Sequence, residues 1–439
     1  MSMSLRTLRN CFEGVIPSII ATSDDEGIPN VSYLSQVHYV DDEHVALSNQ
    51  FFSKTARNVE LTGQATVLVV DGRTGQQYEL DLVFERAVES GDTFSRIDAQ
   101  IRATVAHEGP GVPWLLRSAD IYRVRGCQLV PAQPEPPAAE LLGQDSDALL
   151  SAAARLAMRL AKTSDPDAMI DDLLDGLQRE LGYSNAIVLL ADEERGRLTT
   201  IGSRGYSLSG VGSEARIGEG AIGVAAASAR AVRINDMSRG RRYAAAVGGE
   251  AGERVIPLPG LAEPQSQLAA PMISNGRVQG VLFAEDARRF RFTHADEDAL
   301  AMLALQLAGG LRLSEAETPG ARRGGQAPAP AGRPFHVRYH SFDDSLFIDD
   351  VYLIKGVPGR LLFHLLKLHA ESGRTEFSNR ELRLDGALRL PELKDNLEAR
   401  LILLRRRLDE KEAPVRITRP ERGLIHLELT RPPRLEVAT

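Results

Sequence analysis

The sequence predicts a multidomain protein built from three blocks with different secondary structure. Residues 14–130 contain short runs in which apolar and polar residues alternate, a pattern typical of antiparallel β-strands. Residues 145–315 combine long helical patterns with strands, and the residues from 335 onward end in a helix followed by a basic hairpin. A chain of 439 residues is also too long for one ordinary core, because domains average roughly 150 residues. We therefore expect three domains.

Two segments rich in Pro, Ala and Gly separate these blocks: PAQPEPPAAE from Pro131 and ETPGARRGGQAPAPAGRP from Glu317. Neither segment supplies a periodic apolar face that could pack on a core, so both are expected to be linkers. The expected organisation is a β domain in 1–130, a linker in 131–144, an α+β domain in 145–315, a linker in 316–334 and a helix-and-hairpin domain in 335–434.

Composition limits the compartment and the partners. A formal net charge of −8 argues against a general nucleic-acid coat protein, so any DNA contact has to come from a local basic patch. The two cysteines, Cys11 and Cys127, form no CxxC pair and indicate neither a disulfide framework nor a zinc site. No segment is a signal peptide or approaches the about 20 apolar residues of a membrane span. We expect a cytoplasmic protein without a membrane partner.

Alternating runs in the first block, bounded by turn residues such as Asp25–Gly27 and Asp71–Gly72, predict a small antiparallel barrel. The segment FSKTARNVELTG interrupts the alternation and predicts a helical turn beginning near Lys54 and Thr55. An ammonium and a hydroxyl at a helix N-terminus are groups that suit a phosphate dianion. The runs are VIPSIIATS, VSYLSQVHYV, HVALSN, ATVLVVDG, QQYELDLVFERAVE and ADIYRVRGCQLV.

The segments IIATSDDEGIPNVSYL and VALSNQFFSKTARNVELTGQATVLVV resemble the flavin-binding split barrel of the pyridoxamine 5'-phosphate oxidase-like family. The resemblance implies that FMN is the cofactor and that Lys54 and Thr55 hold its phosphate. It also implies that Ser48 and Asn49 lie near the isoalloxazine edge. We assign no catalytic residue and no metal ligand.

Two further expectations come from this resemblance. Some relatives of the barrel bind haem, which is the alternative cofactor, but the spacing of His38, His44 and His107 selects no ligand. The resembled family places its flavin between two subunits, and the predicted helix from Asp147 to Lys162 carries an Ala/Leu/Met stripe without an obvious partner in its own block. We therefore expect a homodimer.

The second block begins with the helical patterns DALLSAAARLAMRLAKT and PDAMIDDLLDGLQREL and continues with a strand pair, a Gly-rich turn into a helix, a second strand pair about Asn275–Gly276, and a helix capped near Thr293. This order resembles a GAF domain, which implies a small-molecule ligand or association between such domains. The block contains no cysteine, which excludes a covalently attached bilin. We expect a capping or solvent role for His294. We interpret Gly218, Gly220 and Gly223 as turn and packing residues and not as a dinucleotide fingerprint.

In the third block, Leu397, Leu401, Leu404 and Leu408 form one apolar stripe of a helix whose other face is basic. Two alternating segments after Pro414 predict a hairpin. From 400 to 422 there are eight Lys/Arg and four Asp/Glu, a net charge of +4, which suits limited phosphate contact.

Helix plus basic hairpin resembles the winged-helix domain of OmpR/PhoB-type response regulators, with SNRELR as the short second helix and LEARLILLRRRL as the recognition helix. The resemblance implies DNA as the partner. Ile402 and Leu403 depart from that family at positions that face the groove, so docking on protein stays open as an alternative. The expected DNA contacts include Arg400, Arg405, Arg419 and Arg422.

The predicted fold class is multidomain: an antiparallel β split barrel, an α+β GAF domain and a winged helix-turn-helix. This combination of domains predicts a signal-responsive transcription regulator. The first two domains would sense a small molecule, a cofactor or a redox state. The alternatives are a flavin-dependent oxidoreductase regulated by its GAF domain, and an interaction adaptor with degenerate sites.

Overall fold

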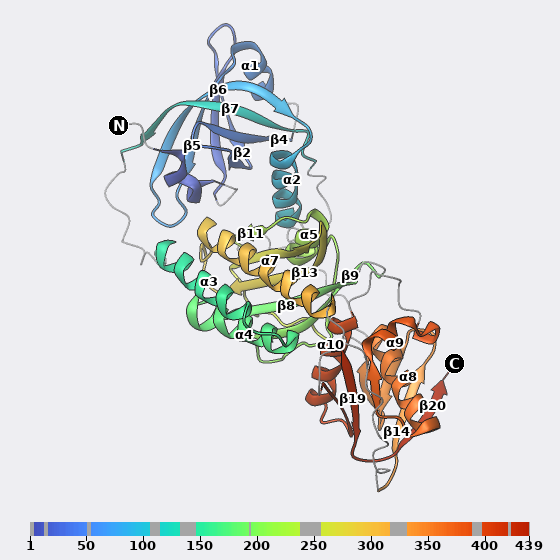
Figure 1. Ribbon diagram of the computed structural model, residues 1–439. Helices are drawn as coiled ribbons and strands as arrows, with labels where there is room; N and C mark the ends of the chain where they lie inside the picture. The colour runs from blue at the N-terminus through green and yellow to red at the C-terminus, as the bar shows by residue number, and fades with distance from the viewer. Residues whose placement is uncertain are drawn as a thin grey trace.

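The structure is a computed structural model and describes residues 4–12, 16–50, 54–105, 115–131, 146–192, 195–237, 256–316, 332–388, 397–419 and 423–438. Three domains follow one another along the molecule, from the N-terminal domain at the top of Figure 1 to the C-terminal domain at the lower right. The expected linkers fall mainly on 132–145 and 317–331, outside the described residues. Within the described residues, no helix is long and apolar enough to cross a membrane.

The first domain is a curled antiparallel sheet, visible as half a barrel in Figure 1, in which seven described strands pair in the order β2-β1-β5-β6-β7-β4-β3. All six predicted runs contain strands, and the second run contains both β2 and β3. Buried residues such as Val45, Val67 and Leu80 form its core. The elements are η1 Leu5–Cys11, β1 Ser18–Ser23, β2 Pro29–Leu34, β3 Val37–Tyr39, β4 His44–Asn49, α1 Lys54–Thr62, β5 Gln64–Val70, β6 Gln77–Val88, α2 Asp92–Val105 and β7 Ser118–Leu129.

The helix α2 lies outside the predicted runs and connects the first domain to the second. Ile97 and Ile101 pack in the first domain, whereas Ala99 and Ala103 join a cluster of the second domain. Figure 1 shows α2 standing between the two sheets. The i, i+4 spacing within each pair is the signal that could have identified this helix in the sequence.

The second domain is a sheet of six described strands in the order β10-β9-β8-β13-β12-β11, with helices on both faces. The helices α3, α4 and α7 cover one face, and α5 covers the other together with α2 (Figure 1). The elements are α3 Ser146–Leu160, α4 Pro166–Glu180, β8 Asn185–Asp192, β9 Arg197–Arg204, β10 Glu214–Arg216, α5 Gly220–Ser228, β11 Val232–Ile234, β12 Ser266–Ser274, β13 Arg277–Asp286 and α7 His294–Ala316.

Local chemistry explains where these elements begin and turn. Asp165 caps α4 by accepting a hydrogen bond from the amide of Ala168, and Pro166 occupies the first turn, where no amide donor is required. Thr293 and Asp296 form the predicted cap of α7. The Thr293 amide donates to the Asp296 carboxylate at 2.7 Å, and the Asp296 amide donates to the Thr293 hydroxyl at 3.2 Å. Asn275 and Gly276 have φ angles of 50° and 72°, as the turn between β12 and β13 requires.

The third domain contains two small sheets and the predicted helices, and the predicted hairpin forms part of the second sheet. Four described strands pair as β16-β15-β14-β20, with β20 parallel to β14, and three pair as β17-β19-β18. Ser378 caps the short α9 through the amide of Glu381. The elements are β14 Phe335–His340, β15 Ser345–Ile348, β16 Val351–Ile354, α8 Val357–Ser372, β17 Glu376–Ser378, α9 Asn379–Leu384, η2 Gly386–Leu388, α10 Leu397–Glu410, β18 Val415–Thr418, β19 Leu424–Leu429 and β20 Pro433–Ala438.

Candidate functional site

A pocket with a cavity volume of about 120 Å³ opens in the first domain between β2, β4, α1 and β7. Three of the four residues that the sequence assigned to a cofactor line it: Ser48, Asn49 and Thr55. The structure therefore brings together residues from the end of β4 and the start of α1. Further polar lining groups are Ser32, Ser35, Gln50, Asp120 and Tyr122.

Lys54 and Thr55 begin helix α1, and Thr55 is the one that lines the pocket. The Thr55 hydroxyl accepts a hydrogen bond of 2.9 Å from Asn30 Nδ2. The Lys54 side chain is 52% exposed, and its ammonium lies 3.8 Å from the Asp24 carboxylate. The first turn of α1 carries no acidic side chain, so no carboxylate of that turn offsets the positive end of the helix dipole. An anion beside this turn would meet the helix N-terminus, a hydroxyl and an ammonium together.

Gln50 is a pocket residue that the sequence analysis missed. The residue is 9% exposed, and its Oε1 accepts a hydrogen bond of 3.0 Å from the Ser35 hydroxyl. Its Nε2 is buried without a partner among the described residues. An unpaired buried donor costs free energy, so a donor left open at a pocket is suited to a ligand acceptor. Its place directly after the strand VALSN was the available signal.

Asp120 supplies the pocket's carboxyl group and accepts from Ser118 at 2.7 Å and Asn49 at 3.1 Å. Burial raises the pKa of Asp120 above its usual value, against the lowering effect of these two hydrogen bonds. Ser48 is buried, and its amide and hydroxyl both donate to the carbonyl of Gln36, at 3.1 and 3.4 Å. The backbone therefore already binds the Ser48 hydroxyl, whereas Asn49 and Asp120 present a connected polar pair.

Haem was the alternative cofactor, and the two described histidines of the first domain, His38 and His44, do not line this pocket. His38 is buried in β3, and His44 lies 2.8 Å from Asp41 and 3.4 Å from Glu85; neither lines the cavity. His107 lies outside the described residues. In the part of the chain that is described, no group of three or more His, Cys, Asp or Glu could hold a metal ion.

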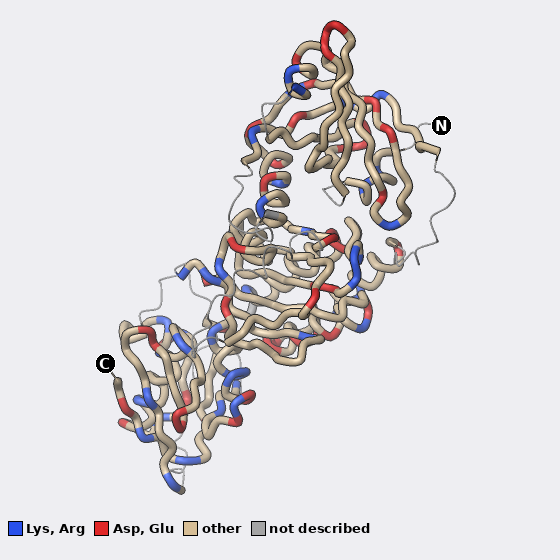
Figure 2. The backbone as a smooth tube through the Cα atoms, turned by 180° about the vertical axis from the view of Figure 1, so that it is seen from behind, with Lys and Arg blue, Asp and Glu red and all other residues tan. Residues whose placement is uncertain are grey.

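Carboxylates of the second domain pair with the predicted recognition helix, α10. Arg400 lies 3.0 Å from Asp192, at the end of β8. Arg405 and Arg406 both pair with Asp167, near the start of α4, and Arg406 also lies 3.0 Å from Asp171. Blue and red segments meet where the two domains adjoin in Figure 2. Two of the predicted DNA contacts, Arg400 and Arg405, are thus bound within the chain.

The other two predicted DNA contacts lie in or near the hairpin. Arg419 pairs with Glu398, a buried residue near the start of α10 that also accepts from Asn379. Arg419 is therefore bound inside its own domain, with its side chain 16% exposed. Arg422 lies outside the described residues.

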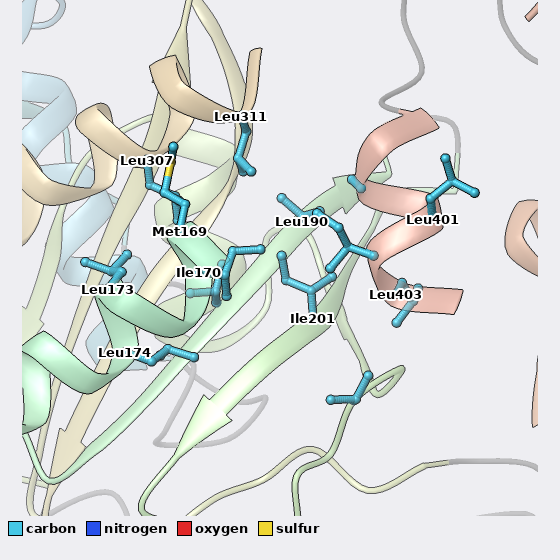
Figure 3. Packing of buried hydrophobic residues seen from close by; sticks show 14 of the residues in the cluster. Met169, Ile170, Leu173, Leu174, Leu190, Ile201, Leu307, Leu311, Leu401 and Leu403 are labelled. Carbon is cyan, nitrogen blue, oxygen red and sulfur yellow. The ribbon is translucent and has the colours of Figure 1, made fainter. Parts of the chain in front are cut away.

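Apolar packing joins the same two domains. Ile402 and Leu403 are buried, and one hydrophobic cluster contains them together with residues of α4, β8, β9 and α7. Figure 3 shows Leu190 and Ile201 between the second-domain strands and α10. A side chain at Gly202 of β9 would meet Arg406 Nη1 at 2.7 Å, so the glycine gives the guanidinium room. Ile402 and Leu403, the two residues that depart from the resembled family, therefore pack against the second domain of the same chain.

A second buried network connects the first domain to the second. The Arg233 guanidinium lies 3.1 Å from the Glu297 carboxylate, and Gln100 of α2 bonds both the amide and the carbonyl of Arg233. His294 Nε2 lies 3.1 Å from Arg233, and its Nδ1 lies 3.5 Å from Asn10 of the first domain. The expected capping or solvent role of His294 was wrong: the residue is buried, and its ring lies between Arg233 of β11 and Asn10 of η1.

Comparisons with known families agree with the first two domains. Residues 6–115 match the family described as pyridoxamine 5'-phosphate oxidase, and residues 163–312 match the GAF domain family. No curated protein matches the chain.

Several solved structures are similar to single domains of the chain. A GAF domain from an Acinetobacter phosphoenolpyruvate-protein phosphotransferase is 21% identical, covers 39% of this chain and 96% of its own, and has a TM-score of 0.33. Free methionine-R-sulfoxide reductase from Neisseria meningitidis is 20% identical, with coverages of 40% and 95% and a TM-score of 0.33. An FMN-binding protein from Syntrophomonas wolfei is 14% identical, with coverages of 30% and 90% and a TM-score of 0.24. On the family matches, the chain carries a pyridoxamine 5'-phosphate oxidase-like domain followed by a GAF domain.

Proposed function

We propose that the protein is a sensor that binds FMN in its first domain and regulates transcription through DNA binding by its third domain. The GAF domain lies between these two parts and contacts both. The observation that carries the proposal is the polar pocket of the first domain, in which Thr55, Asn49 and the unpaired Gln50 amide lie beside the start of α1.

The pocket residues fit the chemistry of FMN. Lys54 and Thr55 would hold the phosphate at the N-terminus of α1, where a dianion is favoured by the helix dipole and by a charge-assisted hydrogen bond. The Gln50 Nε2 donor suits a carbonyl of a ring, and Asn49 and Asp120 suit its polar edge. Bound FMN would supply a redox-active ring, so the signal can be a redox state.

Exposed apolar residues beside the pocket of the first domain support the proposal of a homodimer. Tyr33 lines the pocket and is 82% exposed on β2, which is an edge strand of the sheet, and Val31 on the same strand is also exposed. Exposed apolar residues beside an open pocket favour a second copy that covers both. Leu150 and Met158 are further exposed apolar residues, both on α3. Light scattering at micromolar concentration tests the proposal, and the mass of one chain would contradict it.

The third domain supports a DNA-binding output through its topology. Three helices, α8, α9 and α10, precede the hairpin of β18 and β19, in the order of a winged helix. The basic residues of α10 provide the charge that DNA phosphates attract. The pairing of α10 with the GAF domain favours a second candidate, in which the third domain is a protein-docking module. Retention of the full chain on promoter DNA separates these two functions.

The decisive experiment is a titration of the purified protein with FMN, followed by flavin fluorescence. Lys54→Ala should lower the affinity about 10- to 100-fold, because a charge-assisted hydrogen bond contributes about 1.5–3 kcal/mol. Arg57→Ala, an exposed basic residue on the same helix, is the control and should change the affinity little. A wild-type protein that binds no FMN would refute the proposal, and equal affinity in Lys54→Ala would place the phosphate elsewhere. Bleaching of bound flavin by NAD(P)H would favour the oxidoreductase.

A further inference from the structure

The basic face of α10 is already paired with an acidic face of the GAF domain. Arg400, Arg405 and Arg406 are 13%, 26% and 16% exposed, so all three are largely removed from solvent. Their partners Asp167 and Asp171 lie on α4, and Asp192 ends β8. Three guanidinium groups thus face three carboxylates across one domain boundary.

These contacts exclude a polyanion from the same surface. A guanidinium offers a fixed set of N–H donors in one plane, and the donors that bind a carboxylate are the donors that would bind a phosphate. The pairing of Asp167 with two arginines at once places one carboxylate where a phosphate could bridge them. Ile402 and Leu403, at the positions expected to face the groove, are also buried in the docked chain.

A further ion pair, formed by residues outside α10, lies at the same boundary between the second and third domains. The Lys355 ammonium, just after β16, lies 3.1 Å from the Glu214 carboxylate on β10. The Lys355–Glu214 distance therefore reports whether the third domain is docked on the GAF domain, and neither residue belongs to the basic face of α10.

We propose that the acidic face formed by Asp167, Asp171 and Asp192 competes with DNA for Arg400, Arg405 and Arg406, so that the docked chain is inhibited for DNA binding. The inference rests on the proposed DNA-binding function and adds its regulation. Docked and DNA-bound states are mutually exclusive for α10. The measured DNA affinity is therefore the intrinsic affinity multiplied by the fraction of undocked chains.

The test compares two full-length variants of equal charge. The first is Asp167→Asn with Asp171→Asn, which keeps side-chain shape and removes two charges from the acidic face. The control is Asp172→Asn with Glu219→Gln, which removes two charges elsewhere in the GAF domain, where Asp172 accepts from Thr163 and Glu219 pairs with Arg216. Asp171→Asn alone, at a half-exposed position, is a milder variant if the first fails to fold.

Two readouts are needed for each protein. Anisotropy of a short fluorescent DNA duplex of mixed sequence gives affinity, because phosphate contacts do not depend on sequence. Zero-length carbodiimide coupling of Lys355 to Glu214, detected by mass spectrometry, reports docking: the amine and the carboxyl condense to an amide with loss of water. The acidic-face variant should bind DNA at least about tenfold more tightly than the control, with a steeper salt dependence and less cross-link.

The other outcomes overturn the inference in distinguishable ways. Equal DNA affinity of the two variants, with or without loss of the cross-link, would show that the carboxylates do not compete with DNA. Tight binding by the wild type with the cross-link retained would refute the inhibition and leave the DNA-binding function standing. Absence of DNA binding in every protein, including one that has lost the cross-link, would refute the DNA-binding function together with the inference.

Discussion

The pocket of the first domain and the basic face of α10 differ in what their polar groups already bind. In the pocket region, Gln50 Nε2 has no partner in the described residues, and Lys54 is half exposed, with its ammonium 3.8 Å from the Asp24 carboxylate. On α10, each of Arg400, Arg405 and Arg406 meets at least one carboxylate of the GAF domain. The pocket therefore keeps a donor that can bind a ligand, whereas the guanidinium groups of α10 already bind carboxylates of the same chain.

This contrast shows what a cluster of cationic residues predicts. Such a cluster predicts that an anion lies nearby, but it does not say whether that anion is a phosphate or a carboxylate of the same chain. A cation that belongs to a ligand site should be removable without loss of stability. A cation that belongs to an internal pair should not, because its removal leaves a carboxylate without its partner.

The largest effect is expected at a fully buried internal pair, that of Arg233 with Glu297. Arg233→Met should lower the free energy of unfolding by about 3 kcal/mol, at the low end of the range for a broken buried pair, because Arg96 still lies 3.2 Å from Glu297. Arg230→Met is the control, since its partner Asp92 is exposed, and should cost about 1 kcal/mol or less. Urea unfolding of both variants, followed by circular dichroism, measures the difference. Equal losses would mean that the buried network does not hold the first two domains together.

An intermediate effect is expected at the boundary of the third domain. Arg400→Ala removes the pair with Asp192 and should lower the free energy of unfolding by about 1.5–3 kcal/mol. Arg416→Ala, on the exposed side of β18, should change it by less than about 0.5 kcal/mol. The same urea experiment separates the two. If Arg400→Ala were neutral, the α10 face would resemble the pocket, and its assignment as an internal pair would be wrong.

In the pocket, removal of an unpaired polar group should lower ligand affinity and not stability. Gln50→Met removes an unpaired buried donor and also the acceptor of the Ser35 hydroxyl, two effects of opposite sign, so the free energy of unfolding should change by less than about 1 kcal/mol, while FMN affinity should fall up to about tenfold for one neutral hydrogen bond. Gln64→Met, at an exposed position of β5, controls for the substitution itself. Denaturation and flavin titration are measured on the same preparations. Loss of stability without loss of affinity would make Gln50 a structural residue.

The sequence predicted the fold well where periodicity alone decides it. Six alternating runs and the capped helices of the GAF domain all formed as expected, because alternation and caps are local. It failed where the partner of a residue is distant in the chain: nothing local pairs Arg406 with Asp167, or Arg233 with Gln100. Ile402 and Leu403 were the exception, because apolar residues on a second helix face indicate a protein partner even when that partner is unknown.

The smallest effect expected is a pH dependence at the pocket carboxyl. Burial raises the pKa of Asp120 in the folded chain, so between its unfolded and folded pKa values the folded state binds more protons. Stability should therefore fall as pH rises through this window, from just above the ordinary value of about 3.9 up to the raised one. Asp120→Asn removes the titration, and its stability relative to the wild type should rise with pH across the same window. Asp25→Asn, on the exposed turn before β2, controls for the lost charge. A difference between Asp120→Asn and wild type that is independent of pH would mean that the two hydrogen bonds from Ser118 and Asn49 fully offset burial, and Asp120 would then belong with the paired groups of α10 and not with the open pocket.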